Sequence, residues 1–476
     1  MRDPQQVLNA LCEHSKDSDY RYERLYRILF NEQMFFIAYQ RKYANQGNMT
    51  PGSDGRTIDR MSIDRIQKIV ASLRDESYKP HPARRVYIPK KNGKNRPLGI
   101  PSFEDKLVQE VVHMILEAIY EGHFEDTSHG FRPNRSCHTA LRDIKVTFKG
   151  TRWFIEGDIK GFFDNIDHNI MIDILRERIS DERFLRLIRK FLNAGYMEKW
   201  TYNNTYSGTP QGGIISPILA NIYLDKFDKY IKEYADNFNR GRGRRLTQEY
   251  QRNRNQRNVL RWKLEAETDE NRKVELKSKI AEMRKKMLDI PATRDIDDAF
   301  RRLKYVRYAD DFLIGVIGSK EECEKIKADI TTFMSDKLKL EMSQEKTLIT
   351  NAQEPAKFLG YEINARRSMD HTRTRSGLQR RPWLGTIVLK VSYETVLKRL
   401  QYYDAVLITQ VNRKETLKPS SRKYMVNRQD ADILAQYNLE LRGFYNYYSI
   451  ADNIGYWGWK FNYFMKYSLS LIHISE

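Results

Sequence analysis

Residues 305–316 of the chain read YVRYADDFLIGV, an acid pair between two short apolar runs. The aromatic and β-branched residues predict strands over Tyr305–Tyr308 and Phe312–Val316, joined by a tight turn. Adjacent carboxylates in such a turn repel each other, and a fold seldom keeps them there without a cation that offsets the repulsion. The stretch therefore predicts a metal-binding hairpin in a β-sheet.

A second acid-bearing strand precedes this hairpin. Trp153–Asp158 is a short apolar run that ends on an acid, and a helix from about His168 follows it. An Asp at a strand end more often caps a helix or a turn, so this segment alone indicates little. Hard cations such as Mg²⁺, however, take carboxylates from distant segments, and two such ions can stabilise the entering and leaving oxygens of a phosphoryl transfer. Together the segments predict a two-metal site at Asp158, Asp310 and Asp311.

The composition indicates a polyanionic partner. The 476 residues include 83 Lys and Arg against 63 Asp and Glu, a formal charge of +20. A basic balance of this size favours nucleic acid. The 29 Tyr and 21 Phe could add faces on which bases stack, although ordinary core packing accounts for most of them.

Neither a disulfide framework nor a zinc site is expected. Cys12, Cys137 and Cys323 are odd in number and widely spaced. The chain contains no apolar stretch of about 18 residues, so we expect a soluble cytoplasmic protein without membrane partners. Four histidines do not match the spacing of a tetrahedral site and are expected to be structural. They are His113, His123, His129 and His138.

Ahead of the acids, predicted helices alternate with predicted strands. Apolar periodicity predicts an opening helix over Ser18–Tyr43 and further helices over Ile63–Leu73 and Phe103–Tyr120. Arg84–Ile88 and Pro97–Ile100 read as strands around a Gly-centred basic loop, which predicts a basic hairpin. This alternation favours an α+β fold in which helices cover one face of a core sheet.

Residues 240–294 differ in composition from the rest of the chain, with 17 Lys and Arg against 8 Asp and Glu. Such a run is typical of a solvated insertion, but Arg240–Arg257 also resembles an RNA-contacting arm, and both explanations stay open. From about Arg381 the chain is expected to be helical, basic and Tyr-rich. The second half of residues 240–294 carries the apolar stripe of a helix that packs on a partner. The stripe is Leu276, Ile280, Met283, Met287 and Ile290.

Further motifs surround the acids in a fixed order. They are Arg96–Pro101 (RPLGIP), His129–Ser136 (HGFRPNRS), Gly208–Pro217 (GTPQGGIISP) and Leu441–Tyr448 (LRGFYNYY). With YADD at Tyr308–Asp311, the reverse-transcriptase signature, this set resembles bacterial group II intron reverse transcriptase-maturases. The resemblance extends over roughly residues 50 to 465, and the conjunction is far more specific than any single motif.

The resemblance implies a right-hand polymerase, α+β in class, with fingers, a palm built on an antiparallel sheet, and an α-helical thumb that doubles as the maturase domain. The resemblance also implies domain boundaries. They are 1–150 for an N-terminal extension and fingers, 151–365 for the palm with a basic helical insertion at about 238–298, and 375–468 for the thumb. Residues 469–476 resemble the translation of a sequencing-library adapter. We therefore expect them to be a non-native tail and the native protein to continue beyond about residue 468.

The resemblance also implies roles at the polymerase centre. Asp158 and Asp310 are implied to be the principal ligands of two Mg²⁺ ions, for which Mn²⁺ could substitute, with Asp311 in support. Phe163 is implied to crowd the sugar 2′ position of the incoming dNTP, and the alternative is a buried core ring. Lys346 matches a candidate acid for protonating pyrophosphate, and a surface lysine is an equally good explanation.

Three more positions match residues that bind the dNTP. Lys90 and Arg96 flank a Gly93 turn that would let two cations converge on one polyphosphate. Gln211 lies among small residues that permit close backbone approach. Lys90 and Arg96 are implied to hold the triphosphate, and Gln211 to line the pocket for the nucleotide and the template.

The remaining site residues are expected to contact nucleic acid. Arg132, Asn134 and Arg135 carry donors suited to backbone phosphates, and the resemblance places this segment along the template. Phe358, Leu359 and Gly360 look like the primer-grip hairpin of the family. The basic arm is predicted to contact intron RNA through Arg240, Arg242, Arg244 and Arg245.

The expected function is RNA-directed DNA synthesis, together with intron RNA binding that assists splicing and mobility. The partners would be an RNA template, intron RNA, a DNA primer or target, and dNTPs. One alternative is a splicing-only maturase, which degenerate acids would signal, whereas Asp158, Asp310 and Asp311 all stand. Another is a domesticated reverse transcriptase in phage defence, diversity generation or CRISPR adaptation. The oligomeric state cannot be predicted from this sequence.

Overall fold

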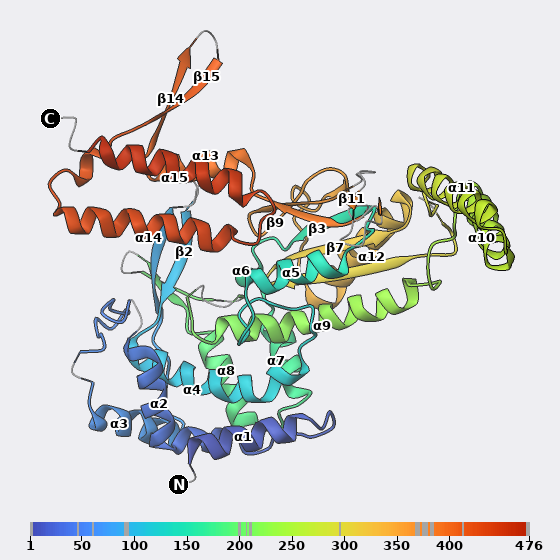
Figure 1. Ribbon diagram of the computed structural model, residues 1–476. Helices are drawn as coiled ribbons and strands as arrows, with labels where there is room; N and C mark the ends of the chain where they lie inside the picture. The colour runs from blue at the N-terminus through green and yellow to red at the C-terminus, as the bar shows by residue number, and fades with distance from the viewer. Residues whose placement is uncertain are drawn as a thin grey trace.

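The computed structural model describes residues 3–44, 47–59, 61–89, 95–198, 201–205, 207–208, 212–294, 297–366, 372–373, 379–380, 385–411 and 414–472. An N-terminal helical layer, a central region of sheets and a C-terminal helical layer follow one another across the molecule (Figure 1). Within these ranges, no helix has the length and apolar character needed to cross a bilayer.

The opening segment differs from its prediction. Ser18–Tyr43 is not one helix, because the 3₁₀ turn η1 (Tyr26–Phe30) and helix α2 (Glu32–Tyr43) are separated at Asn31, whose side chain caps α2 by accepting from Gln33. Helix α1 (Pro4–Ser15) was not predicted from the sequence. The helices that follow are α3 (Ile63–Arg74), α4 (Phe103–Tyr120), η2 (Glu121–His123), α5 (Cys137–Thr147), α6 (Phe162–Asn165), α7 (His168–Arg176) and α8 (Glu182–Leu192).

The predicted basic hairpin is confirmed. Strands β1 (Ala83–Pro89) and β2 (Asn95–Ile100) pair in antiparallel fashion, with Ile88 opposite Arg96. Short strands β4 (Tyr196–Glu198) and β5 (Thr201–Asn203) extend the sheet in the order β2-β1-β4-β5. Arg96 therefore lies at the far end of the hairpin, next to the loop.

The two predicted acid-bearing segments are neighbours in one sheet. Its order is β6-β7-β3-β8, from β6 (Arg302–Tyr308), β7 (Asp311–Ile317), β3 (Trp153–Asp158) and β8 (Ile349–Asn351). All three pairings are antiparallel, and the β3–β7 register sets Asp158 opposite Asp311. The expected antiparallel palm sheet is confirmed.

Helices cover both faces of this sheet, so the expectation of one covered face was wrong. Successive residues of a strand point to opposite faces. Ile155 accordingly packs in the hydrophobic cluster that includes residues of α9 (Ser216–Phe238) and α12 (Lys320–Leu338), whereas Phe154 packs with residues of α5 and the C-terminal part. Asp158 ends β3 and Asp311 begins β7, so these acids lie at one end of the two central strands of a sheet that is packed on both faces.

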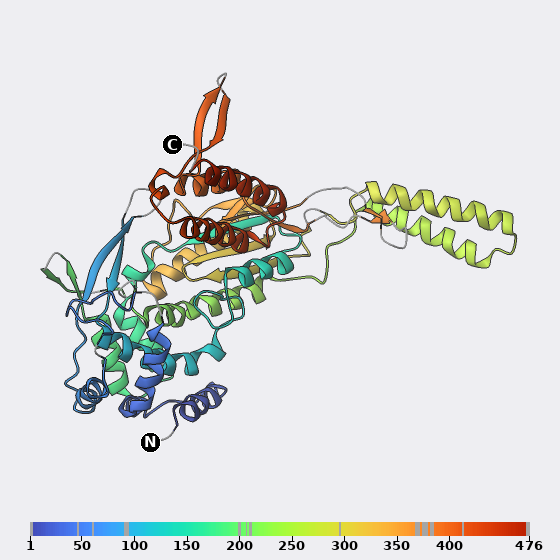
Figure 2. The same ribbon diagram turned by 60° about the vertical axis from the view of Figure 1, so that its left-hand side comes forward.

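Both halves of the basic insertion contain a helix, not only the second half. Helices α10 (Gln248–Ala266) and α11 (Glu270–Asp289) pack on each other and project away from the body (Figures 1 and 2). The predicted stripe lies on the packed side, with Met287 buried and the other four residues partly buried. Its partner is therefore α10, and Ile290 follows the end of the helix.

The C-terminal third is less helical than expected. A sheet of β9 (Ala356–Phe358), β10 (Tyr361–Ala365) and β13 (Ile387–Lys390) precedes α13 (Tyr393–Tyr402). A projecting hairpin then precedes the final helices α14 and α15 (Figure 1). The remaining elements are β11 (Thr372–Arg373), β12 (Gln379–Arg380), β14 (Val406–Val411), β15 (Lys414–Pro419), η3 (Lys423–Met425), α14 (Asp430–Tyr448) and α15 (Ile454–Ser470).

Candidate active site

The acid pair lies where the sequence placed it, at a turn between two strands. Tyr308 pairs with Asp311, so Ala309 and Asp310 form the turn, and Ala309 has a φ of +55°. Burial raises the pKa of Asp310, and the negative charge of Asp158 adds to the rise. Burial also raises the pKa of Asp311 to about 7, helped by the charge of Asp310 and a hydrogen bond with Asp158. The carboxylates therefore crowd one another, and their repulsion is incompletely offset.

Two cations oppose this negative charge. Lys346 Nζ lies 2.8 Å from Asp158 Oδ2, and this hydrogen bond raises the pKa of Lys346, which keeps the ammonium protonated. The positive charge of Arg96, at the end of the basic hairpin, offsets part of the rise in the pKa of Asp310. The turn that carries Lys346 is itself anchored, because Ser343 N–H donates to the Asp158 carbonyl over 2.9 Å.

The donor set suits a hard divalent cation. Carboxylates offer only oxygen acceptors, and Mg²⁺ is bound in proteins through one or two carboxylates, water and substrate phosphates. Across the described ranges, no group of His, Cys, Asp or Glu side chains has the arrangement of a metal centre. Asp158 is held by Lys346 instead. The argument for a divalent cation at this site therefore depends on the carboxylate chemistry of the three acids and on their closeness to one another.

Phe163 belongs to a row of aromatic rings, not predicted from the sequence, that leads through Phe131 to Tyr308 at the end of β6. Its half-buried ring meets Phe131 edge to face, with ring centroids 6.5 Å apart, and Phe131 also contacts Tyr308. Phe131 is 50% exposed and has a φ of +58°, unusual for an aromatic residue. Phe131 lies inside the HGFRPNRS motif, and this position could have identified it as a site residue beside the polar residues of the motif.

Two glycines of the Gly-rich segment lie close to backbone atoms of other parts of the chain. A Cβ at Gly208 would lie 2.5 Å from the Phe163 carbonyl oxygen, and one at Gly212 would lie 2.4 Å from the Gly99 carbonyl oxygen. The segment thus passes against both the Phe163 turn and strand β2. Gln211 itself, like Lys90, lies outside the described residues, so their predicted roles stay predictions.

Arg132 is a correction to the expected template contacts. Its side chain is buried and ion-paired to Glu121 over 2.9 Å, and it donates to the carbonyl oxygens of Glu125 and Ser128. Its donors are thus engaged inside the protein, as composition alone could not show. Arg135 is partly exposed and paired with Asp126, and Asn134 is exposed with a φ of +59°. Only these two face the surface.

The predicted primer-grip segment is a hairpin turn between β9 and β10. Leu359 and Gly360 form the turn with φ of +48° and +73°. The hairpin is tied to the acid-bearing sheet, because Lys357 N–H donates to Glu156 over 2.9 Å. It is tied to α14 by the Tyr447 hydroxyl, which donates to the Leu359 carbonyl over 2.8 Å. The turn therefore links β3 with the C-terminal helices.

The four arginines of the basic arm lie at the base of the α10–α11 hairpin, apart from the acids. Arg240 and Arg245 are more than half exposed and paired with Glu322 and Asp297. Arg242 is exposed, whereas Arg244 donates to the Gly150 carbonyl over 2.5 Å. Arg244 thus fastens the insertion to the body and is the least available to a ligand.

Comparison with known proteins agrees with these motifs. The family described as reverse transcriptase (RNA-dependent DNA polymerase) matches residues 88–246 and 282–363, with a break over all of α10 and the first part of α11, up to residue 281. The family described as type II intron maturase matches residues 385–472.

Individual relatives match over nearly the whole chain. The group II intron-encoded protein LtrA of Lactococcus lactis subsp. cremoris is 45% identical over 98% of this chain and 77% of its own length. An uncharacterized 91 kDa protein in the cob intron of Schizosaccharomyces pombe is 40% identical over 94% of this chain and 54% of its own. A Candida albicans telomerase structure matches 87% of this chain and 62% of its own at a TM-score of 0.39 and 12% identity, too distant to add to the assignment. The chain therefore belongs to the group II intron-encoded reverse transcriptases that carry a maturase domain.

Proposed function

We propose that this protein extends a DNA primer on an RNA template by Mg²⁺-dependent nucleotidyl transfer at Asp158, Asp310 and Asp311. The observation that carries the proposal is the β3–β7 register, which sets Asp158 opposite Asp311 and beside the Asp310 turn. Two bound ions would stabilise the oxygens that enter and leave at the α-phosphate. The intact acids also weigh against a splicing-only protein.

Other side chains supply binding and proton transfer. Arg96, whose charge acts on Asp310, would bind the triphosphate of a dNTP. Lys346, whose ion pair with Asp158 keeps it protonated, would give a proton to the leaving pyrophosphate. In this proposal Phe163, whose ring contacts Phe131, would lie beside the sugar of the dNTP.

The direct test is primer extension on an RNA template at increasing Mg²⁺, with EDTA as the metal-free condition. We expect DNA product that depends on Mg²⁺ and on all four dNTPs, and that returns when the chelated enzyme is resupplied with Mg²⁺. Product formation that persists in EDTA would exclude the proposed chemistry.

Phe163→Ala is expected to lower the preference for dNTP over rNTP. Removing the ring opens space beside the 2′ position, and steric rejection in such a pocket is worth about tenfold or more. The ratio of kcat/KM for the two nucleotides measures it. Phe36→Ala, on the distant helix α2, should leave the ratio unchanged. If both variants keep the wild-type ratio, Phe163 serves only to pack against Phe131.

A second function, intron RNA binding, is favoured by the maturase match and by the basic arm. Each phosphate contact steepens the fall of log K with log salt by about 0.7 to 0.9. Changing Arg240, Arg242 and Arg245 to Gln should therefore flatten the slope for intron RNA by roughly two units and leave primer extension intact. Arg244 is spared because it holds Gly150.

The matched control removes the same number of charges from α12, as Lys320→Gln, Lys325→Gln and Lys337→Gln. It should keep the wild-type slope. Equal slopes for intron RNA and a plain primer-template, unaffected by the arm variant, would identify residues 240–245 as a solvated connection.

A further inference from the structure

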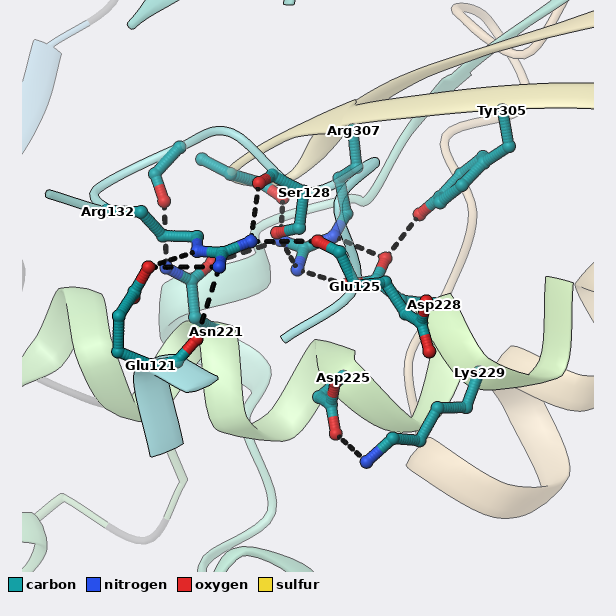
Figure 3. A network of polar contacts seen from close by, with 12 residues as sticks. Glu121, Glu125, Ser128, Arg132, Asn221, Asp225, Asp228, Lys229, Tyr305 and Arg307 are labelled. Carbon is teal, nitrogen blue, oxygen red and sulfur yellow. Dashed lines mark hydrogen bonds and ion pairs between the residues drawn. The ribbon is translucent and has the colours of Figure 1, made fainter. Parts of the chain in front are cut away.

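Next to the acid turn, Arg307 of β6 is fully buried and forms an ion pair with Asp228 of α9, in which Arg307 Nη2 lies 2.6 Å from Asp228 Oδ2 and neither side chain is exposed (Figure 3). A guanidinium has five N–H groups in a fixed plane. In this structure it makes five hydrogen bonds. The acceptors are Asp228 Oδ1 at 2.8 Å, Asp228 Oδ2 at 2.6 Å, Ser128 Oγ at 2.7 Å, Asn221 Oδ1 at 3.2 Å and the Ala309 carbonyl oxygen at 2.8 Å.

The bond to Ala309 reaches the turn that holds the acids. Ala309 adopts the left-handed conformation, which L residues other than Gly adopt at a cost and keep only where the surroundings impose it. Its carbonyl precedes Asp310 directly, so the guanidinium fixes the peptide plane from which the Asp310 side chain leaves. The conformation of the turn is thus set from inside the protein.

A second element braces the same turn from behind. The segment 127–130 runs beside β6, where Arg307 N–H donates to the Thr127 carbonyl over 2.8 Å and His129 N–H donates to the Arg307 carbonyl over 2.9 Å. Asn221 then donates to the Gly130 carbonyl over 2.8 Å. A Cβ on Gly130 would lie 2.3 Å from Ala309 N, so only glycine lets the two backbones meet.

Stability alone does not explain this arrangement. A buried ion pair loses so much hydration that well-packed apolar residues of similar volume are often as stable. What apolar side chains could not supply is the set of directed bonds that joins α9, the 127–130 segment and the turn. The Tyr305 hydroxyl adds a bond to Asp228 over 2.7 Å, which fixes the carboxylate in turn.

We propose that Arg307 is a positioning residue, which with Asp228 and Asn221 sets the conformation of the Ala309–Asp310 turn and thereby the affinity of the acids for divalent cations. The inference rests on the proposed function, because it concerns the same acids. It assigns Arg307 no contact with substrate.

The test compares Arg307→Lys with Arg422→Lys. Lysine keeps the charge of Arg307 and loses the planar fork. Arg422 is an equally buried arginine, 2.6 Å from Glu440 in the C-terminal part, and does not touch the turn. Mn²⁺ binding is measured by the loss of the free-ion EPR signal, on the full chain bound to a primer-template with a dideoxy end. The Mn²⁺ bound by the Asp310→Asn variant is subtracted, because it represents ions bound away from the acid turn.

We expect Arg307→Lys to weaken the Asp310-dependent Mn²⁺ binding at least tenfold and to lower kcat far more than it raises KM for dNTP. Arg422→Lys should change the thermal midpoint without changing Mn²⁺ affinity. If Arg307→Lys fails to fold, Arg307→Met with Asp228→Leu, which keeps an apolar core, should show the same loss of affinity.

The inference is overturned if a folded Arg307 variant binds Mn²⁺ as the wild type does. If Asp310→Asn is inactive in that case, the proposed function survives and Arg307 has a structural role only. If the wild type shows no Asp310-dependent Mn²⁺ binding and Asp310→Asn is active, both fail together.

Discussion

Asp310→Asn is expected to reduce DNA synthesis on a primed RNA template by about a thousandfold or more. A divalent cation contributes several kcal/mol of transition-state stabilisation, and each 1.36 kcal/mol corresponds to tenfold in rate. The amide keeps the shape of the side chain but removes the charge that holds the cation. Single-turnover extension of a labelled primer measures the loss.

Asp336→Asn is the matched control, at an exposed acid on α12 that accepts a hydrogen bond from its neighbour Ser335. It should extend primers at the wild-type rate. The Asp310 variant should also keep or gain thermal stability, because the substitution relieves repulsion with Asp158 and Asp311. Wild-type synthesis by the folded Asp310 variant would move the chemistry away from this turn.

Gly130→Ala is expected to lower kcat/KM by about a hundredfold, which is the scale of loss that a shift of about 1 Å in a reacting group produces. The added Cβ would stand 2.3 Å from Ala309 N, and backbone cannot swing away as a flexible side chain could. The turn itself must therefore move. Steady-state primer extension at saturating Mg²⁺ measures the effect.

Gly455→Ala provides the matched control, since a Cβ at that helical glycine meets nothing within 4 Å. It should be fully active. Wild-type activity of Gly130→Ala, with the same melting temperature as the control, would show that the turn tolerates displacement and that its backing segment does not position the acids.

The acid-bearing sheet could be predicted because its signals are local. Tyr308–Asp311 forms a turn between strands whose residues favour no other state, and Trp153–Asp158 is the strand that the sequence indicated. What the sequence did not reveal is which strands are neighbours, since pairing is a property of the whole fold. The second covered face was missed for a similar reason, because Phe154 and Ile155 are equally apolar.

The sequence did not predict which arginine side chains are buried or which acceptors they bind. Arg132 and Arg135 are nearly adjacent and carry the same donors, yet one is buried against backbone carbonyls and the other reaches the surface. Only the path of the chain between η2 and α5 separates them. Arg307 lies within residues 305–316, but the acceptors of its side chain come from α9, the 127–130 segment and the turn. No spacing in the sequence brings these together.

Asp158, Asp310 and Asp311 are proposed to hold two divalent cations, which a crystal structure with Mn²⁺, an RNA template, a dideoxy-ended DNA primer and dNTP would locate. We expect two anomalous peaks between these carboxylates, about 4 Å apart and about 2.1 Å from their oxygens. Lys346 should then have moved off Asp158. Density for the nucleotide without a Mn²⁺ peak at Asp310, or with both peaks elsewhere, would contradict the account.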